Sequence, residues 1–103
     1  MIAPVVENNL PTIADLCGKH HVRRLELFGS AAREDYDPAR SDLDFLVDFL
    51  PLQSGQHADA YFGLLEDLQH LFGRPVDLVM SRAIRNRYLR ESIDESRTVV
   101  YAA

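Results

Sequence analysis

The sequence contains one cysteine and no tryptophan, and its apolar residues never form a long run. The single cysteine, Cys17, excludes an internal disulfide and cannot form a zinc site alone. The apolar runs extend over only a few residues, whereas a membrane-spanning helix needs about 20, so no membrane segment is predicted. Residues 1–7 carry neither a basic region nor a long apolar stretch, which argues against a signal peptide. Together these absences favour a cytoplasmic protein.

Basic residues are also scarce. The chain has 11 lysines and arginines against 16 acidic residues, which gives a formal net charge of -5 and a pI near 5.2. Proteins that bind nucleic acid over a broad surface are normally basic, so no direct nucleic-acid partner is expected. Apolar residues, in contrast, make up 47% of the 103 positions, enough to bury the core of one domain spanning residues 1–103.

Apolar periodicity divides the chain into alternating helices and strands. Helical spacing predicts helices at residues 10–17, 61–72 and about 84–93. Gly18 and Gly73 are suited to end the first two of these helices. Alternating or continuous apolar segments predict strands at residues 22–28, 43–49, 75–80 and 98–101.

The order of these segments predicts an α/β (α+β) fold, with a small mixed sheet flanked by helices. Parallel pairing is plausible for the two strands joined across the long helix. The link at residues 29–42 is irregular, with a short helix that could begin at residue 31, and it leaves the pairing of the first two strands open. Residues 54–57 are predicted to form a loop.

Asp42 and Asp44 are the first candidates for chemistry. They are two residues apart at the start of a predicted strand, so their carboxylates would project from one face while Leu43 and Phe45 point to the other. Two close negative charges repel unless a cation or a proton lies between them, and oxygen ligands suit Mg²⁺ or Mn²⁺. The alternative is an exposed strand face whose carboxylates are simply solvated.

Asp77 interrupts the apolar strand at residues 75–80. A carboxylate in such a run is costly to bury unless it is paired, protonated or bound to a metal ion. If this strand neighbours the one that follows Asp42, Asp77 could complete a cluster of three carboxylates. The alternative is an edge-strand residue that faces water.

Gly29 and Ser30 lie between a strand and a candidate helix. Glycine allows a ligand to approach the backbone closely, and free N–H groups at a helix start favour an anion such as phosphate. The Ser30 hydroxyl could donate one more hydrogen bond. As an isolated motif, the pair is equally consistent with an ordinary turn in which Ser30 caps a helix.

The combination of these features is more specific than any one of them. Gly29 and Ser30 after a strand, the Asp42–Leu43–Asp44 segment on a second strand and Asp77 on a third resemble the polymerase-β-like nucleotidyltransferase superfamily. The sequence is most similar to the minimal nucleotidyltransferases, or MNT domains, from about residue 22 to residue 101. The resemblance implies the polymerase-β-like nucleotidyltransferase fold.

The resemblance also implies roles for individual residues. Asp42 and Asp44 would be ligands of two Mg²⁺ ions, and Asp77 would bind the ion on the nucleophile side and could act as general base. Gly29 and Ser30 would hold the β and γ phosphates of the nucleotide.

Arg33 follows Ser30 by one helical turn, so it could contact a phosphate or instead pair with a nearby acid. Family members often have glycine directly after this arginine, whereas this chain has Glu34. That difference concerns the loop and leaves the proposed ligands in place.

The resemblance further suggests the partner. Minimal members commonly pair with a small helical HEPN protein, an RNase toxin, and transfer AMP from ATP to one of its tyrosine hydroxyls. We therefore expect an antitoxin that is a Mg²⁺-dependent protein adenylyltransferase and forms a hetero-oligomer with a HEPN-type toxin. Two alternatives remain: an antitoxin that masks its partner without catalysis, and nucleotidyl transfer to a small molecule.

Overall fold

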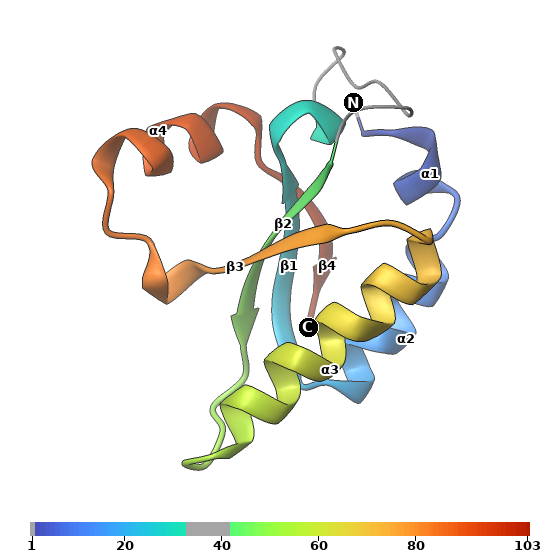
Figure 1. Cartoon of the computed structure of the whole chain (residues 1–103), viewed down its shortest axis with the longest axis vertical. Helices are drawn as coiled ribbons and strands as arrows, with labels where there is room; N and C mark the ends of the chain where they lie inside the picture. The colour runs from blue at the N-terminus through green and yellow to red at the C-terminus, as the bar shows by residue number, and fades with distance from the viewer. Residues whose placement is uncertain (1, 33–41) are drawn as a thin grey trace.

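The structure of the chain, a computed structural model, describes residues 2–32 and 42–103 and is built around a four-stranded sheet. The strands are β1 (Val22–Phe28), β2 (Leu43–Phe49), β3 (Val76–Met80) and β4 (Thr98–Ala102), in the order β3-β2-β1-β4 (Figure 1). β2 and β3 are parallel, whereas β1 is antiparallel to both β2 and β4. The predicted mixed sheet is therefore confirmed, and the pairing that the sequence left open is antiparallel.

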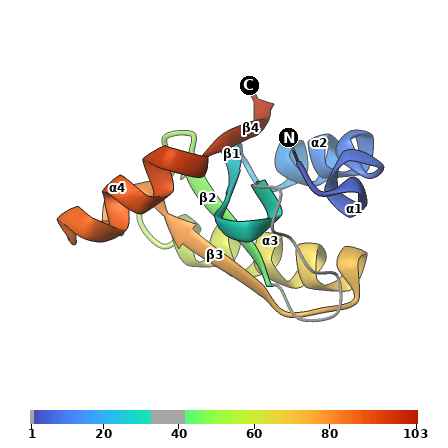
Figure 2. The same ribbon diagram turned by 90° about the horizontal axis from the view of Figure 1, so that it is seen from above.

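Helices cover both faces of this sheet. The helices are α1 (Pro4–Glu7), α2 (Leu10–Lys19), α3 (Gln56–Phe72) and α4 (Arg87–Ser96), and two short 3-10 turns, η1 (Gly29–Ala32) and η2 (Ser81–Ala83), follow β1 and β3. Figure 2 shows α2 and α3 on one side of the sheet and α4 on the other. None of the helices in the described part of the chain is long and apolar enough to cross a membrane.

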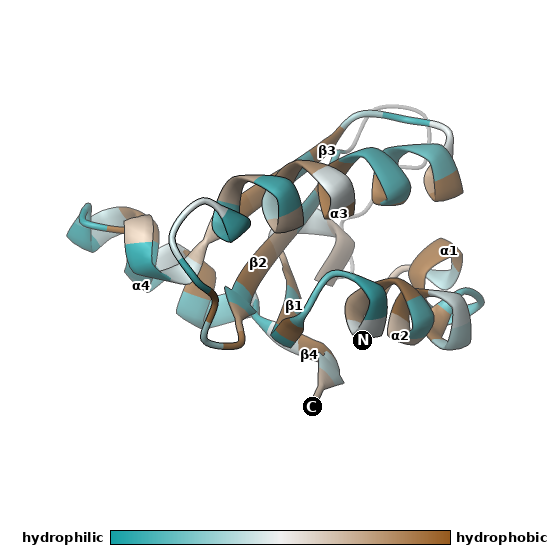
Figure 3. Cartoon of the chain, turned by 90° about the horizontal axis from the view of Figure 1, so that it is seen from below, coloured by the Kyte–Doolittle hydropathy of each residue, from teal (hydrophilic) through white to brown (hydrophobic). Residues whose placement is uncertain are grey.

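The core lies between the sheet and the pair α2 and α3. β1 and β2 turn alternate residues toward this side, and the amphipathic colouring of both helices follows it (Figure 3). The largest fully buried side chains include Phe45, Leu25, Leu27, Leu64 and Leu68. Cys17, at the end of the helix predicted for residues 10–17, is part of this core, and burial raises the pKa of its thiol to about 12.

Two helix starts differ from the prediction. α3 begins at Gln56, inside the predicted loop, where the Gln56 side chain accepts a hydrogen bond from the Gln53 amide at 3.0 Å. The first turn of α3 is mostly exposed, so it contributes little apolar periodicity to the sequence. α4 begins at Arg87 rather than near Ile84, because the Asn86 side chain caps it by accepting two backbone N–H groups.

Candidate active site

Asp44 and Asp77 are brought together by the parallel pairing of β2 and β3. The two residues are direct register partners, so they lie side by side on neighbouring strands about 4.8 Å apart. Their side chains share the sheet face opposite α2 and α3, since Leu43 and Phe45, which alternate with Asp44, are fully buried in the core. Asp77 is exposed on an edge strand, which is the alternative that the sequence left open. It also lies beside Asp44, because β3 is the neighbour of β2.

Asp42 lies immediately before β2 and is exposed. β2 begins at Leu43, as predicted, so Asp42 is the residue that precedes the strand. Asp42 is therefore at the end of β2 that also carries Asp44, next to the register pair. The backbone positions of the three predicted aspartates thus lie at the same end of two neighbouring strands.

Gly29 begins the turn after β1 and lies against the Asp44 carboxylate. Its backbone is left-handed, with φ of 73°, a conformation that L side chains rarely adopt. A Cβ atom at this position would lie 2.5 Å from Oδ2 of Asp44, too close for any other residue without a shift. The absence of a side chain at residue 29 therefore lets the Asp44 carboxylate pack directly against the turn.

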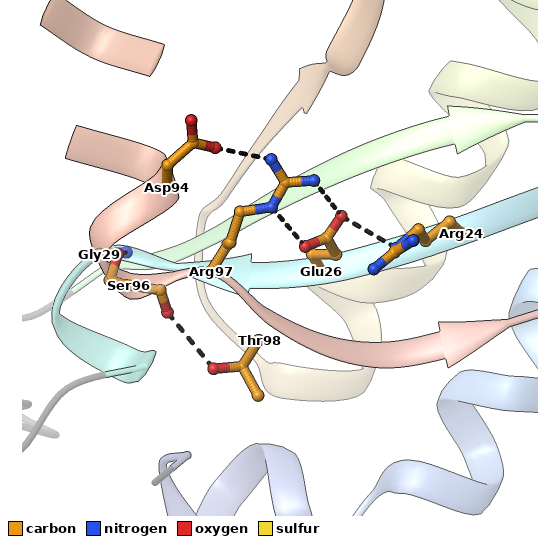
Figure 4. A network of polar contacts seen from close by, with 7 residues as sticks. All are labelled: Arg24, Glu26, Gly29, Asp94, Ser96, Arg97 and Thr98. Carbon is orange, nitrogen blue, oxygen red and sulfur yellow. Dashed lines mark hydrogen bonds and ion pairs between the residues drawn. The ribbon is translucent and has the colours of Figure 1, made fainter. Parts of the chain in front are cut away.

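The Gly29 amide is already engaged within the fold. Its N–H donates a hydrogen bond of 3.0 Å to Oγ of Ser96, the last residue of α4 (Figure 4). Ser30, in η1, is half-buried. The proposed phosphate contact of this turn consequently depends on Ser30 more than on Gly29.

A buried ion pair lies further along the same face of the sheet. The Glu26 carboxylate is 4% exposed, and Nε and a terminal nitrogen of Arg97 each donate to it at 2.8 Å (Figure 4). Arg97 also donates to Asp94 at 2.7 Å, and Arg24 lies 3.1 Å from Glu26. The hydrogen bonds to Glu26 raise the pKa of Arg97 above its usual value, and the bond to Asp94 adds a smaller contribution in the same direction. Glu26 is thereby fully committed to a structural pair.

A polar cavity of about 190 Å³ adjoins this ion pair. It lies beside the even-numbered residues of β2 that follow Asp44 along the strand. Its lining combines both signs of charge with one leucine, and consists of Arg24, Glu26, Leu46, Asp48, Ser81 and Arg97. No local pattern in the sequence predicts the cavity or the roles of Ser96 and Arg97.

The carboxylates fit a hard divalent cation by their chemistry. Asp44 and Asp77 offer oxygen donors from adjacent positions, and Mg²⁺ is usually bound through one or two carboxylates together with substrate phosphates. Within residues 2–32 and 42–103, no three acidic, histidine or cysteine side chains are arranged around one metal position. The structure places Asp44 and Asp77 on adjacent register positions, and their binding of a metal ion stays a prediction. Arg33, predicted to contact a phosphate, lies outside the described residues.

Tyr61 and Phe62, two neighbouring aromatic residues of α3, differ in their burial. Tyr61 packs against the core and donates its hydroxyl to the Leu78 carbonyl at 2.6 Å. The helical spacing of the sequence favours core packing over stacking on a base for both residues, and this expectation is wrong for Phe62, which is 63% exposed. The periodicity fails here because Phe62 is one position beyond the buried stripe of α3.

The fold and the carboxylate group together define a class of enzyme. Residues 11–100 match the model of the nucleotidyltransferase domain family. The chain belongs to this family and is a nucleotidyltransferase.

Two relatives from Methanocaldococcus jannaschii are similar to this chain in sequence. One is 38% identical over 77 residues, which cover 75% of this chain and 74% of the relative. Another is 35% identical over 77 residues, covering 75% of each chain. Both are provisionally named protein adenylyltransferases. A solved structure described provisionally as a minimal nucleotidyltransferase is 30% identical, covers 95% of both chains and has a TM-score of 0.68.

Solved toxin–antitoxin complexes share the fold. A chain in the complex of a tri-AMPylated Shewanella oneidensis HEPN toxin with an MNT antitoxin matches with a TM-score of 0.64. The identity is 19%, over 95% of this chain and 73% of that chain. A toxin–antitoxin structure with AMP-PNP matches at 20% identity, with a TM-score of 0.67, over 92% of this chain and 74% of that one. These similarities confirm the predicted fold.

Proposed function

We propose that this nucleotidyltransferase is a Mg²⁺-dependent protein adenylyltransferase that acts as an antitoxin. It transfers AMP from ATP to a tyrosine hydroxyl of a HEPN-type toxin partner. The observation that carries the proposal is the register pair of Asp44 and Asp77 beside the Gly29 turn, because that arrangement places paired carboxylates next to a candidate phosphate site.

The proposed reaction is a displacement at the α phosphorus of ATP. The tyrosine oxygen forms a bond to this phosphorus, the bond to the β-phosphate oxygen breaks, and pyrophosphate leaves. Asp77 accepts the proton of the attacking hydroxyl. Asp42, Asp44 and Asp77 would hold two Mg²⁺ ions, which lower the pKa of the hydroxyl and neutralise phosphate charge.

The remaining site residues bind and orient the nucleotide. Ser30 donates its hydroxyl to a phosphate oxygen, and Arg33 supplies positive charge. Such a site acts mainly by positioning and by charge stabilisation. This agrees with a site made of carboxylates and a glycine turn.

The choice of a protein acceptor has two supports. The named relatives are provisional protein adenylyltransferases, and one solved structure that shares the fold contains a HEPN toxin carrying AMP groups. The net charge of -5 also disfavours an RNA acceptor.

The test is an intact-mass measurement of the partner. The purified chain is incubated with the HEPN-type protein encoded beside it, ATP and Mg²⁺, with EDTA in a parallel sample. We expect one or more AMP additions, which EDTA and Asp42→Asn abolish. Asp15→Asn is the matched control, because Asp15 is an exposed carboxylate on α2, on the opposite side of the sheet.

The same experiment separates catalysis from masking. The fold is shared with antitoxin chains in toxin complexes, which supports binding as a second route to neutralisation. An Asp42→Asn variant that forms a complex and still neutralises the toxin without AMP transfer would favour masking. A wild-type chain that transfers no AMP to this partner would overturn the proposal.

A further inference from the structure

Ser96 lies at the junction of α4 and β4, far from the turn in sequence but in contact with it in space. The residue is 7% exposed, and its Oγ accepts the Gly29 N–H at 3.0 Å. Its own carbonyl accepts a bond of 3.3 Å from the Thr98 hydroxyl. Ser96 thus carries a nearly buried hydroxyl that is hydrogen-bonded to the backbone of the predicted phosphate turn (Figure 4).

The contact continues from Gly29 to the carboxylates. Gly29 packs against Asp44 so closely that a Cβ at residue 29 would force the Asp44 carboxylate to shift, and Asp44 is the register partner of Asp77. A change at Ser96 therefore reaches the acidic pair through a single intervening residue. The route is made of a hydrogen bond and a direct packing contact.

Neighbouring residues hold Ser96 in place. Arg97, the next residue, makes two 2.8 Å bonds to the buried Glu26 of β1 and a third bond to Asp94 of α4. A two-point bond to a buried carboxylate fixes direction as well as distance. The junction of α4 and β4 is consequently anchored to the same strand that ends at Gly29.

We propose that Ser96 is a positioning residue of the nucleotidyl-transfer site. Its hydroxyl fixes the Gly29 amide and, through it, sets the Ser30 turn relative to the Asp44 carboxylate. Glycine has the greatest backbone freedom of any residue, so a turn at Gly29 needs an external partner to hold one orientation. This inference rests on the proposed function, because the site that it positions is the transfer site.

The experiment compares Ser96→Ala, Ser96→Thr and the control Thr98→Val. Ser96→Ala removes the acceptor, Ser96→Thr keeps a hydroxyl, and Thr98→Val alters the same junction without touching Gly29. Three quantities are measured for each protein: the chemical shift and exchange rate of the Gly29 amide, the Kd for AMP-PNP with Mg²⁺, and kcat and KM for transfer. Thermal unfolding reports whether each variant is folded.

We expect Ser96→Ala to fold and to lose protection at the Gly29 amide. Its kcat/KM should fall about tenfold, through kcat more than through KM, because a misplaced turn affects alignment at the α phosphorus. Ser96→Thr should recover most of the activity. The activity of Thr98→Val should remain within about twofold of the wild type, because this variant loses only the 3.3 Å bond to the Ser96 carbonyl and a single such bond contributes little.

Two results would overturn the inference. One is a Ser96→Ala protein with wild-type kinetics and an unchanged Gly29 amide. The other is an equal loss in Ser96→Ala and Thr98→Val, which would indicate a general weakening of the junction. If the wild type binds AMP-PNP but transfers nothing, the proposed function fails, and the inference is then judged on the Gly29 amide and on Kd alone. If the wild type does not bind AMP-PNP, both fail together.

Discussion

The two faces of the sheet are built from alternate residues of the same strands, yet their contents differ sharply. The face toward α2 and α3 carries apolar side chains such as Leu27 and Phe45, all buried. The face toward α4 carries Glu26, Asp44 and Asp77, with charge paired or exposed. One face therefore forms the apolar core, and the other carries the charged side chains of the candidate active site.

This comparison teaches that the two properties can be changed separately. A substitution on the α2 and α3 face removes packing, and its cost appears in the free energy of unfolding. A substitution among the carboxylates of the α4 face removes a proposed ligand or the proposed base, and we expect its cost to appear in the rate of transfer. Because successive residues of a strand point to opposite faces, neighbouring positions such as Asp44 and Phe45 are expected to affect different properties, the rate and the stability.

The largest effect is expected at Asp77. Asp77→Asn should lower transfer by about a thousandfold or more while leaving the thermal unfolding midpoint nearly unchanged, because the residue is exposed on an edge strand. Single-turnover transfer and differential scanning calorimetry test this directly. Asp48→Asn, on the same face but further along β2, is the control and should keep most of the activity. Full activity of Asp77→Asn would remove Asp77 from the mechanism.

The opposite outcome is expected for the core face. Leu64→Ala removes a fully buried side chain of α3 and should lower the free energy of unfolding by about 3 kcal/mol. Activity per folded molecule should stay near that of the wild type. Urea unfolding and active-site titration measure the two quantities. A rate loss without a stability loss would show that the two faces are coupled.

A smaller effect is expected where α2 meets α3. Replacing glycine by alanine inside a helix usually stabilises by about 0.5–1 kcal/mol. At Gly63 a Cβ would lie 2.7 Å from the His20 ring, which is 12% exposed and bonded to Asp67 at 2.6 Å. We therefore expect Gly63→Ala to destabilise the protein by about 1 kcal/mol. A gain in stability would show that His20 can move away without loss.

The smallest effect concerns pH. The hydrogen bond from His20, with a further contribution from Lys19, lowers the pKa of Asp67 below its ordinary value of 3.8. A lowered folded-state pKa contributes stability that is complete above the unfolded value and disappears as pH falls through the folded one. The stability difference between wild type and Asp67→Asn should therefore be less than about 1 kcal/mol at pH 6 and shrink below pH 4. A difference that grows toward pH 3 would contradict this.

The sequence predicted the parts of the fold that depend on local pattern. The bounds of β1 and β2 match the prediction, because each strand has a clear apolar alternation between turn residues. The four-residue helix α1 was not predicted, since so short a segment carries no period. The side-by-side placement of Asp44 and Asp77 was stated as a condition on strand order, which the parallel pairing satisfies.

The supporting residues of the site were not predictable in this way. Ser96 and Arg97 contact Gly29 and Glu26 across most of the chain, and no local pattern encodes such a partner. Glu26 resembled the polar side of an ordinary strand, and only the tertiary structure shows that it is buried. Hydrophobic periodicity reports which face is inside, whereas it does not report which polar groups meet.

The crossover from β2 through α3 to β3 has a consequence for how the protein matures. Asp44 and Asp77 are separated by the whole of α3, so a growing or partly folded chain that has not yet added β3 carries only half of the pair. Such long-range contacts form late, because loop closure must precede them. On the proposed function, AMP transfer therefore requires β3 to be paired with β2, and a chain without this pairing is inactive.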